Sequence, residues 1–334
     1  MSNVLYSGFR HDHHNDGAGY DRVVPDGAAY VCGNVLPFGT RRIGTKGRSL
    51  NFLIVDILTF LRGLRFPVIH YIYPENTAYV SSFILKALGK RIVFTIHLGE
   101  DFWVGKPRSL FYKLKQLNLR CADFVITLSQ DQEHRLHDIF PGKTVKFLKH
   151  GLEFKNETLS SEVVASRRNA SKLLAVGKNY RDFDTLKKIA TDLKKHNMEL
   201  HLVGTGLSGA DFNGSSENVV VHGRLTASEY EKLLLESFAM VLPLTFATAN
   251  NALLEAHKFA LPAICSDIDG VSDYATSSTR FFTSVDEFWR EIDSLRALSV
   301  DEYSSLCFAG RDHAEKIYDW SVLQKDTQEF FSIE

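Results

Sequence analysis

The feature of this sequence that most constrains its fold is an alternation of short apolar runs with longer amphipathic stretches. In the first half, the runs rich in Val, Ile and Phe are residues 3–6, 67–71, 91–96, 123–127 and 144–148. The amphipathic stretches between them, long enough to be crossover helices, are residues 50–64, 78–88, 109–119 and 130–139. Apolar strands joined by helices are typical of a buried parallel sheet, so the pattern predicts an α/β fold.

The same pattern resumes after a polar interruption. The second series of apolar runs is residues 172–176, 199–203, 219–222, 239–242 and 262–266. At 334 residues the chain exceeds the size that one hydrophobic core usually supports. We therefore predict four parts, of which two are Rossmann-like domains. These are the first domain (1–152), a linker (153–170), the second domain (171–319) and a C-terminal helix that returns to the first domain (320–334).

Composition excludes several functional classes. The net charge of −1 gives no bulk reason to expect nucleic acid. The four cysteines are far apart and lack C-x-x-C spacing, which argues against a zinc site or a disulfide framework. The first residues lack the pattern of a secretion signal, and no stretch approaches the ~20 apolar residues that span a bilayer. We expect a cytoplasmic protein that is not integral to a membrane.

The most informative segment is residues 245–267, which read TFATANNALLEAHKFALPAICSD. A polar loop opens an amphipathic helix there, and the helix ends before a buried strand. This segment resembles the donor-binding helix of the GT-B glycosyltransferases, above all the large retaining family 4 type, glycosyl transferases group 1. In that family the helix N-terminus faces the diphosphate and a Glu binds the ribose. The resemblance gives these positions to Asn250, Asn251 and Glu255.

The family usually has a second Glu that contacts the donor sugar. Counting back from Glu255, this place is held by Ala247. The departure leaves the identity of the sugar and the stereochemistry of transfer open.

A second segment, LLAVGKNYRDFDTL, follows the strand that ends at Val176. Here the small Gly177 allows Lys178 and Arg181 to turn toward a ligand. In a family that uses no metal, the charge of the leaving diphosphate must be met by Arg, Lys and helix dipoles. The family commonly has Arg at the place of Lys178 and Lys at the place of Phe183, and Arg181 supplies the second charge instead.

Two further segments resemble the third strand of the same lobe and its base-contacting turn. They are LHLVGTG (200–206) and VVVHGRL (219–225). Gly204 allows close approach of the backbone to a ligand. The resemblance implies that the backbone at Arg224 and Leu225 touches the nucleobase.

In the first half, the loop after the first strand reads RHDHHNDGAGYDR. Its glycines, Gly17 and Gly19, are predicted to approach the donor. Its polar side chains are predicted to lie on the acceptor side, and they are His13, His14, Asp16 and Tyr20. Imidazoles and carboxylates are also metal ligands. However, adjacent residues of one loop rarely complete a coordination shell, so we expect no metal.

Another strand end reads FTIHLGEDFW. The family often has a His at this position, close to the transferred sugar, which makes His97 the first catalytic or sugar-orienting candidate. An inverting enzyme needs a general base, for which Glu100 or Asp101 is placed. A retaining enzyme of this family needs none, because the leaving phosphate takes the proton.

The following helix, residues 107–120, has an apolar stripe of Leu110, Phe111, Leu114 and Leu117 with Lys and Arg around it. Such a helix suits an anionic membrane surface, here the inner face of the membrane. A crossover helix with solvated charges has the same pattern.

The resemblance implies a GT-B protein, in which two Rossmann-like domains with parallel sheets face each other across a cleft. It implies metal-independent transfer from a nucleotide-sugar, UDP- or GDP-linked, to a hydroxyl of a glycan or lipid-linked acceptor, as in surface polysaccharide or glycolipid synthesis. No other cofactor is required. The alternatives are an inactive GT-B module that binds a nucleotide or glycan, and a nucleotide-sugar epimerase. A Rossmann oxidoreductase is disfavoured because no G-x-G-x-x-G follows the first strand.

Overall fold

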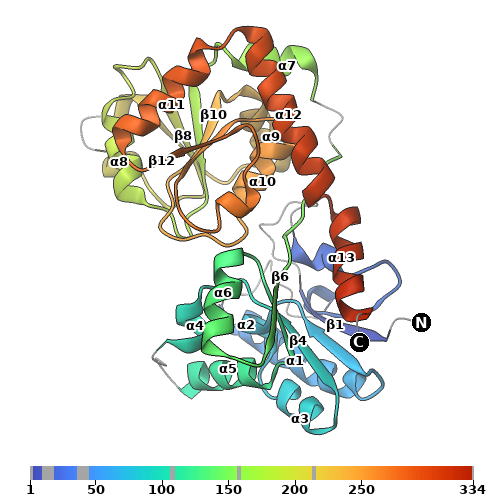
Figure 1. The fold of residues 1–334 in the computed structure, drawn as a ribbon. Helices are drawn as coiled ribbons and strands as arrows, with labels where there is room; N and C mark the ends of the chain where they lie inside the picture. The colour runs from blue at the N-terminus through green and yellow to red at the C-terminus, as the bar shows by residue number, and fades with distance from the viewer. Residues whose placement is uncertain are drawn as a thin grey trace. The chain divides into compact units, whose positions relative to one another are not determined.

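The computed structural model describes residues 3–9, 19–35, 45–105, 110–155, 159–212 and 216–332. The chain divides into two compact units, shown in Figure 1. Unit 1 comprises Met1–Gly151 and Trp320–Glu334, and unit 2 comprises Leu152–Asp319. Four of the predicted site residues, His13, His14, Asp16 and Gly17, lie outside the described ranges.

Unit 1 contains a six-stranded parallel sheet in the order β2-β1-β3-β4-β5-β6. The strands are β1 (Val4–Gly8), β2 (Ala29–Cys32), β3 (Val68–Tyr71), β4 (Arg91–Thr95), β5 (Phe124–Thr127) and β6 (Thr144–Phe147). The helices are α1 (Thr45–Gly63), α2 (Pro74–Thr77), α3 (Ser81–Ala87), α4 (Glu100–Val104), α5 (Leu110–Cys121), α6 (Gln130–Ile139) and α13 (Trp320–Ser332), and the short 3₁₀ helices are η1 (Tyr20–Val23) and η2 (Gly33–Val35). The central strand β3 is buried along its whole length, as a strand covered on both faces must be.

Unit 2 repeats this architecture with the strand order β12-β11-β10-β7-β8-β9, again all parallel. The strands are β7 (Lys172–Val176), β8 (Glu199–Val203), β9 (Val219–His222), β10 (Ala239–Leu242), β11 (Ala263–Ser266) and β12 (Thr279–Phe282). The helices are α7 (Ser161–Arg167), α8 (Phe183–Thr191), α9 (Ala227–Glu236), α10 (Asn251–Lys258), α11 (Val285–Ala297) and α12 (Val300–Tyr318).

The helix starts in unit 2 follow directly from the sequence. Each begins after a residue whose side chain accepts a hydrogen bond from the first turn, which satisfies an otherwise unpaired N–H group. These capping residues are Ser160, Asp182, Thr226, Asn250, Ser284 and Ser299. At α9 and α12 a Glu three residues later completes a capping box.

Every strand predicted from the apolar runs is present, and the two parallel sheets confirm the α/β class. Two edge strands, β2 and β12, were not predicted. In β2 only Val31 is fully buried among half-buried residues, and in β12 Arg280 interrupts the apolar run. Edge strands need fewer apolar residues than central ones, so their sequence signal is weaker.

The stretch 153–170, expected to be a linker, contains helix α7 and clusters with unit 2. Val164 is buried in the core of that unit. The buried guanidinium of Arg167 donates to the backbone carbonyl oxygens of Phe259 and Ala260, at 2.9 and 3.0 Å. The sequence of α7 holds only two adjacent valines and an arginine that is buried, which is too weak an apolar pattern to predict a packed helix.

The chain enters and leaves unit 2 at adjacent points. The Leu152 amide donates to the carbonyl oxygen of Tyr318 at 2.8 Å, and the Phe154 amide donates to the Asp319 carboxylate at 3.3 Å. Leu152 and Asp319 thereby form a parallel bridge. The two ends of unit 2 are joined to each other.

The C-terminal helix α13 packs within unit 1. Its Trp320 ring contacts Tyr20 and His150, with centroid separations of 5.7 and 5.2 Å. A Cβ atom on Gly151 would come within 2.6 Å of this ring, so the position requires glycine. One turn later Gln324 donates to the carbonyl oxygen of Arg22 at 2.6 Å. No helix in the described part of the chain has both the length and the apolar character needed to cross a bilayer.

Candidate functional site

The loop after β7 folds an arginine back onto the end of its own strand. The Arg181 guanidinium donates from Nε to the carbonyl oxygen of Val176 at 2.8 Å, and from Nη1 to that of Asn179 at 3.2 Å. Gly177 has φ +81°, and a Cβ atom there would lie 3.3 Å from Nη2 of Arg181. The glycine therefore provides both the backbone turn and the space for the guanidinium.

Arg181 is a largely enclosed cation. Burial lowers its pKa to about 10, so it remains charged at neutral pH. Within the described ranges, no carboxylate forms an ion pair with it. A partly desolvated guanidinium without a carboxylate has the charge and the donors that suit a phosphate group.

Lys178, the other predicted phosphate ligand, is exposed on the same loop. The neighbouring Tyr180 has φ +56° and packs its ring edge-on against Phe246, with 4.9 Å between centroids. Its carbonyl oxygen accepts the Thr245 amide at 3.0 Å. The loop after β7 is thus bound to the loop after β10, at the carboxyl ends of two adjacent strands of one sheet.

Glu255 lies on α10, one turn into the predicted donor-binding helix. Its carboxylate accepts the hydroxyl of Tyr230 at 2.5 Å. Burial raises the pKa of Glu255 to about 7, and the Tyr230 hydrogen bond partly opposes this rise. Tyr230 also interacts electrostatically with Arg181. Tyr230, which the sequence analysis did not single out, therefore bonds to the predicted ribose ligand and lies near the predicted phosphate ligand.

The N-terminus of α10 is capped by its own Asn250. The side-chain oxygen of Asn250 accepts the amides of Ala252 and Leu253 at 3.1 and 3.3 Å. They belong to the helix N-terminus that, by resemblance to the family, is predicted to face the diphosphate. Asn251 is the first residue of the helix and is half-buried. Ala247, at the place of the missing Glu, is only 7% exposed.

The loops after β8 and β9 reach the same edge of the sheet. Gly204 has φ +64°, a backbone conformation that favours glycine. Arg224 is exposed and Leu225 half-buried in the turn that precedes α9.

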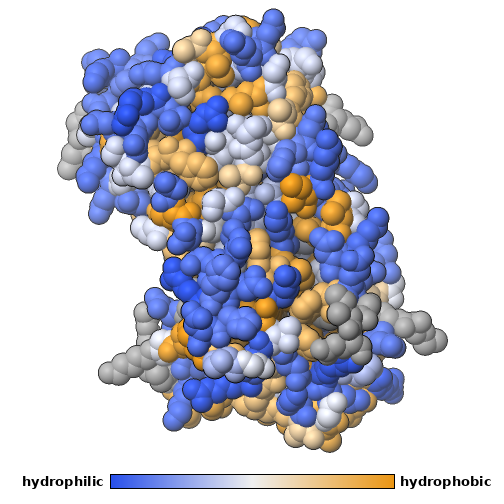
Figure 2. All heavy atoms as spheres, in the orientation of Figure 1, coloured by the Kyte–Doolittle hydropathy of each residue, from blue (hydrophilic) through white to orange (hydrophobic). Residues whose placement is uncertain are grey.

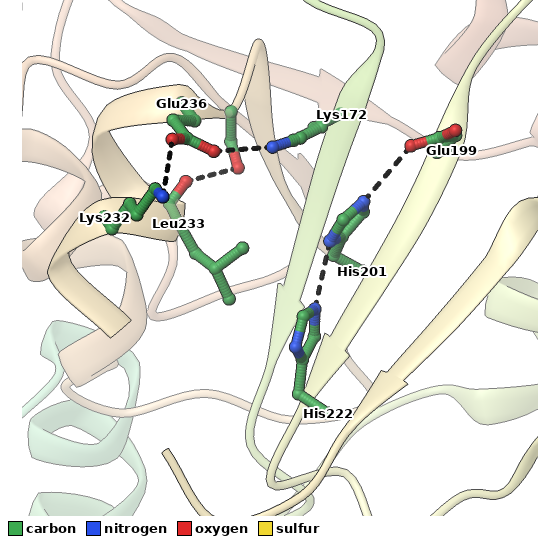
Figure 3. Close-up of polar contacts among 8 residues, drawn as sticks. Lys172, Glu199, His201, His222, Lys232, Leu233 and Glu236 are labelled. Carbon is green, nitrogen blue, oxygen red and sulfur yellow. Dashed lines mark hydrogen bonds and ion pairs between the residues drawn. The ribbon is translucent and has the colours of Figure 1, made fainter. Parts of the chain in front are cut away.

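Below this turn, the strands β8 and β9 are linked by a pair of histidines, shown in Figure 3. His201 Nδ1 lies 3.0 Å from His222 Nε2, and its other ring nitrogen lies 3.4 Å from the Glu199 carboxylate. Figure 3 also shows the ion pair of Lys172 with Glu236, at 2.6 Å, which joins β7 to α9. The histidine pair holds β8 against β9, the strand that leads into the predicted base-contacting turn, and the ion pair holds α9, the helix that follows it.

In unit 1, His97 follows β4 and is half-buried among aromatic rings. It stacks on Tyr73 at 4.4 Å and meets Tyr20 edge-on at 5.1 Å. Its Nε2 lies 2.8 Å from the carbonyl oxygen of Ile72, which can only accept, so Nε2 carries the hydrogen. This fixes the orientation and the tautomer of the imidazole.

Glu75 is a buried carboxylate that the sequence analysis missed. It accepts the His97 amide at 2.5 Å and the Leu98 amide at 3.2 Å. Its second oxygen, Oε2, has no hydrogen-bond partner among the described residues. Burial raises the pKa of Glu75 to about 7. The sequence did hold one signal for Glu75, because it is a carboxylate that directly follows Pro74 soon after the end of β3.

The other predicted site residues of unit 1 lie in different environments. Tyr20 is buried beside His97, and Gly19 is buried just before it with φ −79°, a conformation open to any residue. Asp101 is exposed on α4, and the side chain of Glu100 lies outside what the structure describes. The described residues contain no group of three or more side chains suited to hold a metal ion.

Comparisons with known proteins agree with the fold. The model of the family described as glycosyl transferases group 1 matches residues 170–297. Curated protein sequences give no match.

Several solved structures share the fold over both units. Sucrose-phosphate synthase from Thermosynechococcus elongatus matches with a TM-score of 0.67 and 14% identity, over 98% of this chain and 88% of that one. HepE from Anabaena, solved with UDP and glucose, matches with a TM-score of 0.65 and 15% identity, over 92% of this chain and 87% of that one. TarM matches with a TM-score of 0.63 and 15% identity over 79% of this chain, which spans 54% of the TarM chain.

These findings confirm the resemblance inferred from residues 245–267. The chain has the GT-B fold, and its residues 170–297 match the model of glycosyl transferases group 1.

Proposed function

We propose that the chain is a glycosyltransferase that moves a sugar, of the hexosyl type, from a nucleoside diphosphate sugar to a hydroxyl group of a glycan or lipid-linked acceptor. The observation that supports this most is Arg181, a largely enclosed cation at the carboxyl end of β7 with no carboxylate paired to it among the described residues. The group 1 match covers the same strand and loop.

The proposed chemistry assigns a role to each group in unit 2. When the bond between the sugar C1 and the phosphate oxygen breaks, the diphosphate gains negative charge, and Arg181 stabilises it, with Lys178 reaching in from solvent. A fixed guanidinium supplies this charge without a metal ion. Glu255 accepts the ribose hydroxyls, and the backbone at Arg224 and Leu225 meets the base.

In unit 1, we assign the acceptor side to the residues around His97. The hydrogen bond to Ile72 and the stack on Tyr73 hold the imidazole in one orientation, as a sugar-positioning group requires. In an inverting reaction Asp101 or Glu100 removes the acceptor proton, and in a retaining reaction the leaving phosphate takes it.

The finer assignments follow the same reasoning. HepE, solved with UDP and glucose, supports a UDP-sugar as the donor to test first, with GDP-sugars next. We propose a role in surface polysaccharide or glycolipid synthesis on the cytoplasmic side of a membrane, with the segment 107–120 contacting anionic lipid. The net charge of −1 gives no basis for a nucleic-acid partner.

A second candidate function is an inactive GT-B module that binds a nucleotide or glycan. The observation that favours it is Ala247, a small buried side chain where the family usually places the Glu that contacts the donor sugar. Such a module would bind a nucleoside diphosphate but neither hydrolyse nor transfer the sugar. An epimerase would instead convert the donor in the absence of any acceptor.

The test is calorimetric titration with UDP, GDP, ADP and dTDP, with and without EDTA, followed by product analysis of the matching nucleotide-sugar. We expect one nucleotide to bind equally well with EDTA, and its sugar to be transferred or slowly hydrolysed. Binding without any turnover would favour the inactive module. Binding of none of the nucleotides would contradict both proposals.

A further inference from the structure

Three neighbouring helices of unit 1 present apolar side chains to solvent. On α1 and the residue after it, the exposed positions recur every three or four residues along one stripe. Helices α3 and α5 each carry a shorter stripe of the same kind. The exposed residues are Leu50, Leu53, Ile57, Leu61 and Leu64 at α1, Val80, Ile84 and Leu88 at α3, and Leu110, Leu114 and Leu117 on α5. We call this set the apolar face.

Several polar side chains of these helices are buried, while the apolar ones named above are exposed. The Asp56 carboxylate of α1 is buried and accepts the amides of Tyr79 and Val80, both at 3.0 Å, just before α3. Between α3 and α5, the buried hydroxyl of Ser82 donates to the Asn118 side chain. An amphipathic helix of a water-soluble domain normally shows the reverse arrangement.

The inner contacts also make the apolar face a fixed surface. Asn118 donates to the carbonyl oxygens of Ala78 and Tyr79, at 3.2 and 3.0 Å, so α5 is bound to the start of α3. The Lys115 ammonium donates to the Ala78 carbonyl oxygen at 2.6 Å. These bonds join both α1 and α5 to the start of α3, so the three helices are held side by side with their exposed apolar residues on the outside.

The charged residues around the apolar face indicate what kind of partner it binds. Among the described exposed residues from Ser49 to Arg120, the basic ones on these helices and their ends are Arg62, Arg65, Lys86, Lys113 and Arg120. Of these, Lys86 pairs with the half-buried Asp123 just after α5, which leaves four cations without that partner. The only acids between Thr45 and Cys121 are Asp56 and Glu75, both buried, and Glu100 and Asp101 on α4. The apolar face is therefore bordered by cations and has no exposed acid on its own helices.

We propose that the apolar face is a docking surface for an anionic lipid bilayer, into which the leucine and isoleucine side chains insert while the flanking Lys and Arg meet lipid phosphates. A second copy of the chain is a poorer partner, because pairing this face with itself brings like charges together. Figure 2 shows hydrophobic residues gathered at the end of unit 1 where α3 lies in Figure 1. This surface extends the contact proposed for residues 107–120 to α1 and α3, and it does not depend on the donor assignment.

The experiment is co-sedimentation of the full chain with vesicles of phosphatidylcholine alone, and of phosphatidylcholine mixed with phosphatidylglycerol. The test variant replaces two exposed residues of α1, Ile57→Glu and Leu61→Glu, which are 57% and 54% exposed and should not disturb folding. The control is Val300→Glu, which places one Glu, half of the charge added in the double variant, at a 42% exposed apolar position of unit 2.

We expect the wild type and the Val300→Glu control to bind the mixed vesicles, and the double variant to lose roughly tenfold or more of this affinity. Binding to phosphatidylcholine alone should be weaker. The proposal is wrong if the wild type stays in solution with both vesicles, or if the double variant binds as the wild type does. If the wild type forms a dimer without lipid and the double variant is a monomer, the apolar face is an interface between two copies of the chain. That result would also overturn the proposal. Nucleotide titration of the same samples reports on the donor site separately.

Discussion

Replacing Arg181 with alanine tests the proposed phosphate site directly. The guanidinium is fixed by its bonds to the carbonyl oxygens of Val176 and Asn179. It needs little reorganisation to meet a phosphate. A hydrogen bond to a charged group contributes about 1.5–3 kcal/mol, and 1.4 kcal/mol corresponds to a tenfold change in affinity. We therefore expect Arg181→Ala to weaken binding of the matching nucleoside diphosphate by roughly 10- to 150-fold.

The same change should leave binding of the corresponding nucleoside nearly unaltered, because the base and ribose contacts are assigned to other residues. Isothermal titration of both ligands measures this difference. Arg181→Lys should fall between the wild type and Arg181→Ala, since it keeps the charge but loses the planar fork of donors. Lys188→Ala, which removes an exposed cation from the adjacent helix α8, is the matched control and should bind like the wild type.

Arg181→Ala also removes two hydrogen bonds within the loop, so a fall in thermal stability is expected and must be measured on the same samples. Equal losses for the diphosphate and the nucleoside would show that the variant disturbs the whole site, and would refute the phosphate role. A loss in the Lys188→Ala control of the same size would refute it as well, because affinity would then depend only on net charge.

Three further predictions concern other parts of the chain. Tyr230→Phe removes the hydrogen bond that lowers the pKa of Glu255, so the midpoint of nucleotide affinity against pH should rise above about 7, and an unchanged midpoint would remove Tyr230 from the site. Gly151→Ala should destabilise the chain by roughly 1–3 kcal/mol through its clash with Trp320, as urea unfolding would show, and a neutral effect would mean that α13 packs elsewhere. Burial lowers the pKa of His257 to about 4, so the unfolded imidazole binds a proton near pH 6.5 while the folded one does not. Stability should therefore fall by about 2 kcal/mol from this group as pH drops from 7 to 5, and His257→Gln should reduce that pH dependence.

The fold could be predicted from the sequence because central parallel strands are buried on both faces. Runs such as 91–96 and 172–176 leave no other interpretation once helices lie between them. The edge strand β12 escaped because Arg280 is tolerated where one side of a strand is only half-buried. Helix α7 escaped because Arg167 looks polar in sequence, although backbone carbonyl oxygens satisfy it in the core.

The candidate site was less predictable, since it depends on distances between separate segments. The pairing of Tyr230 with Glu255 joins two helices, and no periodicity within either one indicates it. Glu75 approaches His97 across two strands for the same reason. Asn250 was assigned to the ligand, yet its side chain caps its own helix. The assignments of Lys178, Arg181, His97 and Glu255 to ligands stay predictions.

The bridge between Leu152 and Asp319 has a consequence for how proteins of this design can be recombined. Unit 2 is a continuous segment inserted into unit 1, and its two ends leave the unit as hydrogen-bonded neighbours. An insertion whose ends are adjacent can be excised or replaced without stretching the host chain. Unit 2 therefore satisfies the geometric condition for an exchangeable cassette, which two cuts, before Leu152 and after Asp319, would transplant as one piece.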